Sequence, residues 1–484
     1  MDVDVTVVGS GPNGLAAAVI AARAGLSVRL IERNGRIGGG LRTSELTLPG
    51  FRHDVCSAVH PMALASPFFR AWGLARRVRL IVPDVSYAHP LDGAIAGVAW
   101  RDLERTAAAL GRDGPAWRRL FGPLVAEIDA VGDITGGMLL RMPKHPQTMA
   151  QLGLRALVGG GRGWNVPFAD AIAPALLTGT AAHMAGRHPS LATAAVGLVL
   201  GTHGHGRGWP IPEGGSQAIA DALAADLVAH GGKIVLGVEV NDLGDVAGSR
   251  AVLLDVGVPG LLAIAGDRLP GRYRAALNRY RFGPGVCKVD FALSEPVPWA
   301  APDVRRAGTV HLGGTRAAIA AAENAVLAGR YPEQPYVLVT QPSLFDPSRA
   351  PAGRHVLWAY THVPRGSFED RSEAIVRQIE RFAPGFRETI LAQRVTLAME
   401  MAGYNPNDAG GDIGAGEISV AQLVKRPVLS SAPWQTPVPG VYLCSAATPP
   451  GPSVHGMGGF NAMRLALRDV FGIGEMPDLA SRRM

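Results

Sequence analysis

The sequence predicts an α/β protein with two domains. Its 484 residues are 47% hydrophobic and 18% charged, which is enough apolar material for one large core or two intertwined ones. Residues 3–32 have the pattern of a strand, a glycine turn, a helix and a second strand. Residues 266–429 contain strands with alternating apolar positions beside helical stretches. We therefore expect one domain with a parallel sheet and a second domain of mixed sheet plus helices.

The N-terminal stretch can be placed element by element. Alternate and adjacent valines over residues 3–8 predict a buried parallel strand. Residues 12–24 predict a helix, and Gly25 suits the left-handed position that ends it. Residues 28–31 predict a second buried strand, and Glu32 follows it directly. This order of elements is the start of a βαβ unit.

A G-x-G-x-x-G turn joins the first strand to the helix. Gly9 permits the tight turn, Gly11 lets the backbone approach a pyrophosphate, and Gly14 lets helix and strand pack closely. A pyrophosphate there would lie on a helix N-terminus, whose free N–H groups and positive dipole end attract anions. Glu32 stands where an acid can accept hydrogen bonds from a ribose. The predicted dinucleotide contacts of this stretch are Gly9, Gly11, Pro12, Asn13, Gly14 and Glu32.

The residues after Glu32 indicate which dinucleotide binds. A short spacer leads to three glycines, residues 38–40. An acid, a spacer and a diglycine resemble the extended FAD fingerprint of the flavin amine oxidase and phytoene desaturase superfamily. The alternative is NADP, whose 2′-phosphate Arg33 could meet, but Glu32 would repel that phosphate. FAD is the predicted cofactor, and its further contacts are Arg33, Gly38, Gly39, Gly40, Leu41 and Arg42.

Composition excludes several classes of function. The net charge is +7, but no basic run is dense enough to predict nucleic-acid binding. The excess of arginine reflects either codon bias or a mildly cationic face for anionic lipid. Cys56, Cys287 and Cys444 are far apart, so neither a redox dithiol nor a zinc site is indicated, and a reduced cytoplasmic setting is expected. No apolar run predicts a membrane span, while peripheral membrane contact stays open.

Two histidines lie close to a cysteine in the segment that follows the FAD fingerprint. Residues 51–75 predict a passage from a loop to a helix, and in it His53 and His60 flank Cys56. We interpret the histidines as polar residues near a cofactor, with direct chemistry as the alternative. Further metal ligands are missing from the pattern, so it does not predict a metal site.

The middle of the chain alternates between strand-rich and helix-rich stretches. Residues 76–100 predict strands with breaks at Pro83 and Pro90. Residues 103–204 predict a series of short helices, which is either a lid over an apolar cavity or a plain helical core. Residues 233–240 predict a strand after a helix that ends at two glycines.

The C-terminal signature runs from a strand through a glycine- and proline-rich loop into a helix. The strand covers residues 441–444, and the helix begins near Gly456. Helix N-terminal N–H groups can stabilise the negative charge that a reduced flavin carries at N1 and O2. Gly456, Met457 and Gly458 are the candidates for that contact. His455 is predicted either to contact flavin or substrate, or to fix the loop.

These motifs in this order resemble the FAD-dependent phytoene desaturase-like oxidoreductases. The finer patterns GGGLRT, FGPGVCKVDFAL, YNPNDAGGDI and YLCSAATPPGPSVHGMGGFNA resemble the PYROXD2-like branch. That branch is named after pyridine nucleotide-disulfide oxidoreductases. This sequence has no C-x-x-C and no second G-x-G-x-x-G in a strand–turn–helix context, so it does not predict disulfide reduction or a resident NAD(P) site.

The resemblance implies a Rossmann-type FAD-binding domain that is discontinuous in sequence. It implies that this domain is assembled from residues 1–75, 206–265 and 430–484. The substrate domain is then assembled from residues 76–205, a mostly helical lid, and 266–429, a sheet plus helices. The backbone of Val240 is expected against the adenine, and Thr448 is a further expected contact. The flavin is expected at the junction, where small-molecule sites commonly form.

The resemblance also implies the chemistry. The expected reaction is hydride transfer between a C–H bond of an apolar small molecule and flavin N5, as a desaturation, with oxygen, a quinone or another carrier as electron acceptor. Alternatives are a double-bond saturase or isomerase, an amine oxidase, and an FAD-bound interaction protein with vestigial redox activity. His203, His205 and His455 are the candidate proton acceptors. Residues 405–416 are predicted equally as an active-site border or as a surface loop.

Overall fold

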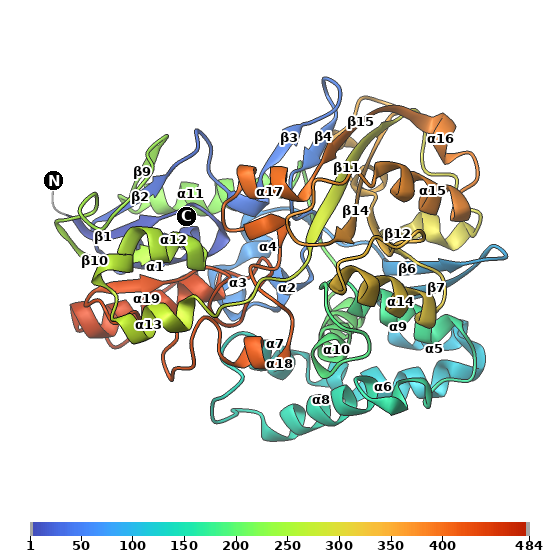
Figure 1. Ribbon diagram of the computed structural model, residues 1–484, viewed down its shortest axis with the longest axis horizontal. Coiled ribbons are helices and arrows are strands. Elements are labelled where there is room, and N and C mark those ends of the chain that lie inside the picture. Colours follow the sequence, from blue (N-terminus) through green and yellow to red (C-terminus); the bar gives the residue numbers. More distant parts are fainter. Residues whose placement is uncertain (1–2, 481–484) are drawn as a thin grey trace.

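The computed structural model describes residues 3–480 and contains two large sheets. Figure 1 shows the parallel sheet at the left, the mixed sheet at the right, and a layer of helices below. The parallel sheet has the order β16 (Val441–Leu443), β10 (Ser249–Leu254), β1 (Val3–Val8), β2 (Val28–Glu32) and β9 (Lys233–Leu236), and every neighbouring pair is parallel. Its strands come from the N-terminal, middle and C-terminal stretches of the chain. The predicted α/β class is confirmed, with a parallel sheet of Rossmann type.

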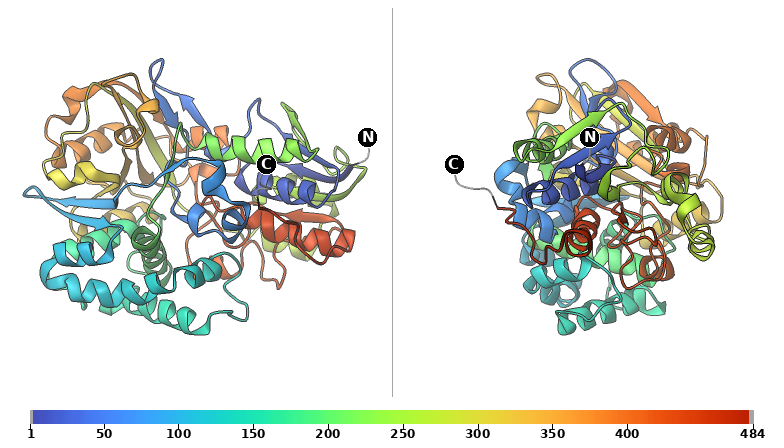
Figure 2. Two further views of the ribbon diagram at one scale, coloured as in Figure 1. Left: turned by 180° about the vertical axis from the view of Figure 1, so that it is seen from behind. Right: turned by 90° about the vertical axis from the view of Figure 1, so that its left-hand side faces the viewer.

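Helices cover both faces of the parallel sheet, because its strands are apolar on both sides. Val5 and Val7 point into a core shared with α1 (Pro12–Arg23), α11 (Gln217–Ala229) and α19 (Met457–Phe471). Val8 and its neighbours point into a second core with α12 (Val258–Ala265) and α13 (Gly271–Leu277). Both views in Figure 2 show α1 and α19 side by side, so the two ends of the chain pack on each other.

The mixed sheet has seven strands. Its order is β15 (Ile390–Thr396), β11 (Gly285–Leu293), β14 (His355–Val363), β13 (Val337–Thr340), β12 (Ala307–Leu312), β6 (Val85–Leu91) and β7 (Ile95–Trp100), and only β12 and β6 pair in parallel. One face packs its aliphatic residues on the amphipathic helix α15 (Ser372–Phe382). Side chains alternate along a strand, so the intervening residues point to the opposite face. That second face looks into the molecule.

A helical layer closes the molecule below the mixed sheet. It consists of α5 (Leu103–Ala109), α6 (Gly114–Ala126), α7 (Ile128–Thr135), α8 (Pro146–Gly159), α9 (Ile172–Ala181) and α10 (Leu191–Gly206), drawn in teal and green in Figure 1. Its largest side chains, which include those of Trp117, Phe121 and Trp209, form one buried cluster. No helix among residues 3–480 combines the length and the apolar character that crossing a bilayer needs.

Short elements join these layers. They are the hairpin β3 (Thr43–Glu45) and β4 (Arg52–Asp54), the pair β5 (Leu80–Ile81) and β8 (Ile211–Pro212), and the helices α2 (Pro61–Ala65), α3 (Pro67–Trp72), α4 (Leu74–Arg77), α14 (Arg316–Leu327), α16 (Phe386–Thr389), α17 (Ala398–Tyr404) and α18 (Val420–Val424). The turn of this hairpin lies between Glu45 and Arg52.

Two sequence-based boundaries are wrong. Pro90 does not break its strand, because the pairing of β6 with β12 ends at Ala88 and leaves the proline no ladder bond to lose on that side. The strand predicted over residues 233–240 ends at Leu236. The chain then turns at Gly237, which has a φ of 70°, and Val238 bonds back to the carbonyl of Glu32.

Candidate functional site

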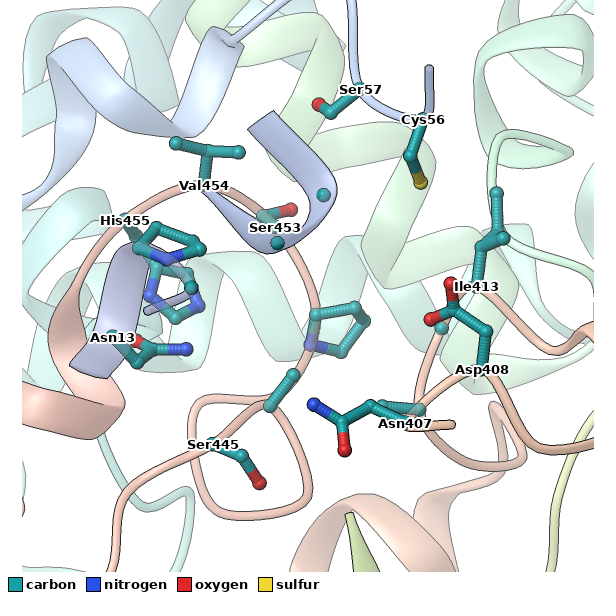
Figure 3. Close-up of a pocket in the computed structure, with 18 of the residues that line it drawn as sticks. Asn13, Cys56, Ser57, Asn407, Asp408, Ile413, Ser445, Ser453, Val454 and His455 are labelled. Carbon is teal, nitrogen blue, oxygen red and sulfur yellow. The ribbon is translucent and has the colours of Figure 1, made fainter. Parts of the chain in front are cut away.

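One cavity of about 990 Å³ joins the two sheets. At one end it is lined by the glycine turn, Glu32 and residues 238–241, and at the other by α8, α10 and the inner face of the mixed sheet. Between them it passes residues 56–62, residues 404–408 and the C-terminal loop 445–455. Figure 3 shows the middle of this cavity, where side chains from all three of these segments approach one another.

The glycine turn leaves no space for side chains. A Cβ at Gly11 would come 2.6 Å from Oδ2 of Asp255, and one at Gly14 would collide with the carbonyl oxygen of Gly9. Gly9 has a φ of 97°, a conformation that favours glycine. Gly14 therefore packs helix α1 on the strand as predicted, and the turn presents bare backbone to the cavity. Gly9, Gly11, Pro12 and Asn13 line the cavity, and Gly14 lies behind them.

Asp255 packs against the glycine turn, and sequence reasoning missed it. It follows β10 directly, and its Oδ2 accepts a hydrogen bond of 2.9 Å from the N–H of Gly14. Burial, with Glu32 nearby, raises the pKa of Asp255 to about 6. The signal for it was available: an acid placed straight after a buried strand of a parallel sheet lies at the ligand-binding edge. The carboxylate of Asp255 therefore accepts from the N–H of Gly14, one of the N–H groups at the start of α1 that were predicted to be free.

Glu32 is held in place at the end of β2. One carboxylate oxygen accepts hydrogen bonds from Ser10, and the other accepts them from Asn34, with Arg42 at 3.3 Å. Burial disfavours the ionised form, but the hydrogen bonds from Ser10 and Asn34 outweigh it and hold the pKa of Glu32 below its usual value. Glu32 is therefore an anchored carboxylate in the cavity wall, and its contact with a ribose stays a prediction.

The triglycine and its flanks are divided between the cavity and the core. Gly39, Gly40 and Arg42 line the cavity, as does Val240 at the far side of the dinucleotide end. Leu41 is fully buried in the core, and Gly38 donates its N–H to the carbonyl of Ser10. The Arg33 guanidinium is directed to Gly403 and Glu239, whose carboxylate lies 3.7 Å away. This orientation favours FAD over the NADP alternative.

The predicted contact at the start of α19 needs correction. The N–H of Met457 donates to Nδ1 of His455, and the N–H of Gly458 donates to Oδ1 of Asn13. A Cβ at Gly456 would meet the ring of Phe68 at 2.6 Å. These glycines therefore serve the close packing of α19 on α1 and α3, and two of the three N–H groups are already used within the protein.

The C-terminal loop nevertheless reaches the cavity through other residues. Ser445, Ser453, Val454 and His455 line it (Figure 3). His455 accepts from Met457 at Nδ1, and its Nε2 is 3.1 Å from the carbonyl oxygen of Gly451, to which it then donates. Its imidazole thus fixes the loop, which was one of the two open interpretations. Burial lowers the pKa of His455 to about 4, so it is neutral there.

Three further site predictions lie away from the cavity lining. Thr448 donates to the carbonyl of Ser445 and stabilises the loop. His205 has both ring nitrogens occupied, since Trp117 donates to Nε2 and Nδ1 lies 2.7 Å from the carbonyl oxygen of Trp100. His203 is fully buried in α10. Neither histidine is among the residues that line the cavity, and the ring of His205 lies between Trp117 and Trp100. We therefore no longer assign either of them a proton-transfer role.

Cys56 and its two histidines are separated by the fold. Cys56 and His60 line the cavity, while His53 lies behind it, 3.5 Å from Asp290. His60 bonds to Ser216, and burial raises the pKa of the Cys56 thiol to about 12. Cys56 and His60 are therefore groups of the cavity wall, while His53 is not, and their closeness to a cofactor stays a prediction. Within residues 3–480 no group of three His, Cys, Asp or Glu side chains is arranged to hold a metal ion.

Asp408 is a second residue that the sequence did not single out. It lies in the loop after α17 and faces the cavity beside Asn407 and Cys56, as Figure 3 shows. The side chain is buried, and its Oδ2 has no hydrogen-bond partner among the described residues. Burial, followed by the nearby charge of Asp412, raises the pKa of Asp408 well above its usual range. Within the loop 405–416, residues 405–408 and 413–415 border the cavity, which favours the first of the two predicted options.

The residues present fit an FAD molecule. The bare glycine turn leaves room for a pyrophosphate, and the anchored Glu32 and Val240 line the same end of the cavity, where contacts with the ribose and the adenine are predicted. Gly39 and Gly40 continue from the glycine turn toward Cys56, because a Cβ at Gly39 would come 3.0 Å from Cα of Gly11 and one at Gly40 would come 3.8 Å from the Cys56 side chain. We call the glycine turn together with these two residues the glycine cradle. The cavity then widens into an apolar compartment, as a site for cofactor plus substrate requires.

Comparisons with known proteins agree with this geometry. Residues 4–60 match the family model described as FAD dependent oxidoreductase. The chain is 26% identical over 552 residues to pyridine nucleotide-disulfide oxidoreductase domain-containing protein 2 of Rattus norvegicus, and the match covers 96% of this chain and 94% of the rat protein. A shorter stretch is 31% identical over 131 residues to one component of the limonene dehydrogenase of Castellaniella defragrans, covering 27% of this chain and 24% of that protein.

The fold also has solved counterparts. A putrescine oxidase variant superposes with a TM-score of 0.61 at 18% identity, covering 97% of this chain and 98% of the oxidase. At that identity the likeness concerns the fold. The matched N-terminal model, the full-length relative and the geometry of the glycine turn agree on one conclusion: the chain is an FAD-dependent oxidoreductase.

Proposed function

We propose that this oxidoreductase desaturates an apolar small molecule, such as a polyene, a lipid or a specialised metabolite. The observation that carries the proposal is the continuity of one cavity from the glycine cradle into an apolar compartment. The compartment is lined by Leu139, Met149, Leu152, Ala156, Leu191, Val196, Val199 and Leu200 from the helical layer. The partial match to a limonene dehydrogenase component supports the same class of reaction.

The chain's own residues orient the substrate and exclude water. FAD, held by the glycine cradle, would supply the hydride acceptor of the reaction at its N5 atom. The helices α8 and α10 cover the compartment, which keeps the reacting carbon in a dry environment. The substrate must then be held with its C–H bond roughly 3–3.5 Å from the acceptor atom. At this end of the cavity the protein therefore orients the substrate and keeps water away from it.

Asp408 is proposed as the proton acceptor. A desaturation removes a hydride from one carbon and a proton from its neighbour, and the remaining electron pair becomes the new double bond. The unpaired Oδ2 of Asp408 faces the cavity between Asn407 and Cys56. In its ionised form a carboxylate with a raised pKa is a stronger base than an ordinary aspartate. Asp408 takes the role that the histidines of α10 cannot fill.

Peripheral membrane contact is proposed as the route for substrate entry. One side of α8 lines the cavity with Leu152 and Ala156, while Leu154 and Leu157 on its other side are more than half exposed. The neighbouring Met142 is also exposed. An apolar patch of this kind marks an interaction surface. Because the patch lies directly outside the apolar cavity, we propose that it contacts a bilayer in which the substrate is dissolved. The electrons then pass to oxygen, a quinone or another carrier.

The proposal is tested on purified protein loaded with FAD. Oxidised protein is mixed anaerobically with lipid extracts, and the visible flavin absorbance is followed. Bleaching supports oxidation of a component of the extract. Turnover that requires prior reduction of the flavin would instead show a saturase, and bleaching by simple amines would show an amine oxidase. A protein that stays colourless after reconstitution with FAD would refute the assignment altogether.

A further inference from the structure

The inner face of the mixed sheet carries a row of polar side chains in the cavity wall. Thr309 on β12 is paired with Thr340 on β13, and Thr340 is paired with Trp358 on β14. Directly opposed residues on neighbouring strands point to the same face and lie close together. All three line the cavity. We call Thr309, Thr340 and Trp358 the polar row.

The polar row has unused hydrogen-bonding capacity. The hydroxyl oxygens of Thr309 and Thr340 and the indole nitrogen of Trp358 have no partner among residues 3–480. Their exposed fractions are 0%, 2% and 6%, so bulk water does not reach them freely. Buried polar groups are normally paired, and a site where three adjacent ones are not paired points to a ligand that supplies the partner.

The surroundings of the polar row are uncharged or already neutralised. Leu338 lies next to it on the same face of the sheet. Lys288, whose ammonium group is 5.5 Å from the Trp358 ring centroid, is paired with the carboxylate of Asp290. At the rim, His183 is bonded to His311, and burial lowers the pKa of His183 to about 3. The row therefore offers hydrogen-bond donors without a net charge.

We propose that the polar row binds an uncharged oxygen of the substrate, a carbonyl or a hydroxyl group carried by an otherwise apolar molecule. The indole N–H can only donate, and the two threonine hydroxyls can donate or accept, which suits a carbonyl or hydroxyl oxygen. This inference rests on the proposed function and narrows its substrate class. It excludes a pure hydrocarbon as the preferred ligand.

The proposal is tested with two probes of equal chain length, 2-octanone and n-octane. Binding to the FAD-loaded protein is measured from the change in flavin absorbance or in the unfolding temperature. Wild type should bind 2-octanone at least about five-fold more tightly, since one net hydrogen bond contributes roughly that factor. The double variant Thr309→Val, Thr340→Val should lose this preference while its affinity for octane changes less than about two-fold.

A stability measurement makes the test independent of the choice of probe. Replacing an unpaired buried hydroxyl by a methyl group removes a desolvation cost, so Thr309→Val and Thr340→Val should leave the unfolding temperature unchanged or raise it. The matched control is Thr361→Val on β14, because that buried hydroxyl donates to the carbonyl of Tyr336 at 2.7 Å. This control should unfold at a lower temperature and keep the preference for the ketone.

Two results would overturn the inference. One is equal affinity for 2-octanone and octane in wild type, or a preference that survives in the double variant. The other, which decides if neither probe binds, is a loss of stability in Thr309→Val and Thr340→Val as large as in Thr361→Val. If lipid extract bleaches the flavin and the ketone preference is absent, only the polar row is refuted. If the ketone binds through the row but no extract ever reduces the flavin, only the proposed reaction is refuted.

Discussion

The two ends of the cavity are built on different principles. At the parallel sheet, the contacts for a ligand come from backbone and from residues close together in sequence, such as Gly9, Gly11 and Glu32. At the mixed sheet, they come from side chains on strands that are far apart in sequence, such as Thr309 and Trp358. The first end suits a cofactor, whose chemical structure is constant. At the second end, a substitution on one strand can alter the ligand contacts without disturbing the others, as a substrate site requires.

The largest effect is expected at the cofactor end. Gly14→Ala places a Cβ against the carbonyl of Gly9 within a turn that cannot move without displacing α1. We expect the variant to bind no FAD after purification or reconstitution, measured as the ratio of flavin to protein absorbance. The control is Gly35→Ala, where an added Cβ meets nothing within 4 Å. If Gly14→Ala retains wild-type FAD, the glycine turn is not the pyrophosphate site.

The next effect concerns the middle of the cavity. Asp408→Asn keeps the shape but removes the proton acceptor, so flavin reduction by an active extract should slow by about 10²–10⁴-fold. Because burial raises the pKa of Asp408, the wild-type rate should rise with pH as the carboxyl ionises, and the variant should lack that rise. FAD content and the unfolding temperature should be at least those of wild type, since Asn carries no charge to bury.

A different result would place the proton elsewhere. If Asp408→Asn slows the reaction but keeps the full pH dependence, the titrating group is another one. Asn407→Asp is a useful companion variant, because it offers a carboxylate one residue away in the same cavity wall. Restored activity in the double variant Asp408→Asn, Asn407→Asp would show that a carboxylate in this part of the wall suffices.

The cofactor end was accessible to sequence reasoning, and the substrate end was not. Strand β1, helix α1 and Glu32 lie where spacing placed them, because the chemistry of that turn depends on local order. The polar row depends on the register of three strands, which no single-sequence pattern specifies. The placement of Gly458 has a similar origin, since its partner Asn13 lies on α1 and the contact is visible only after α1 and α19 are packed together. The bond between Met457 and His455 is local, and the sequence pattern alone does not specify it.

A smaller, pH-dependent effect is expected from Asp255. Its pKa in the folded protein is about 6, above the usual 3.8, so the neutral form is favoured by folding. Its contribution to stability is therefore full below pH 3.8 and is lost as the pH rises through about 6. FAD should also be held less tightly above pH 6, because the ionised carboxylate lies beside the pyrophosphate position. If FAD binding raises the pKa of Asp255 by one unit, the affinity for FAD falls about ten-fold between low and high pH.

Asp255→Asn separates this effect from general loosening of the protein. The amide oxygen can still accept the hydrogen bond from Gly14, so FAD should stay bound equally well from about pH 5 to 8. The dissociation constant of FAD measured by fluorescence quenching across that range provides the comparison. If the dissociation constant of the wild type does not change with pH, or if that of the variant changes as much as that of the wild type, Asp255 does not control FAD binding.

The smallest effect is expected on the outer side of α8. The double variant Leu154→Gln, Leu157→Gln changes two exposed side chains and leaves Leu152 and Ala156 in the cavity wall untouched. Binding to vesicles should weaken a few-fold, because about 0.5 kcal/mol of burial is lost per leucine when only part of each exposed side chain enters the membrane. FAD content and the preference for 2-octanone should not change. The matched control is Val228→Gln on α11, an exposed apolar residue far from the cavity lining. Equal loss of vesicle binding in that control would mean that α8 is not the membrane-facing surface, and substrate would then have to reach the polar row by another path.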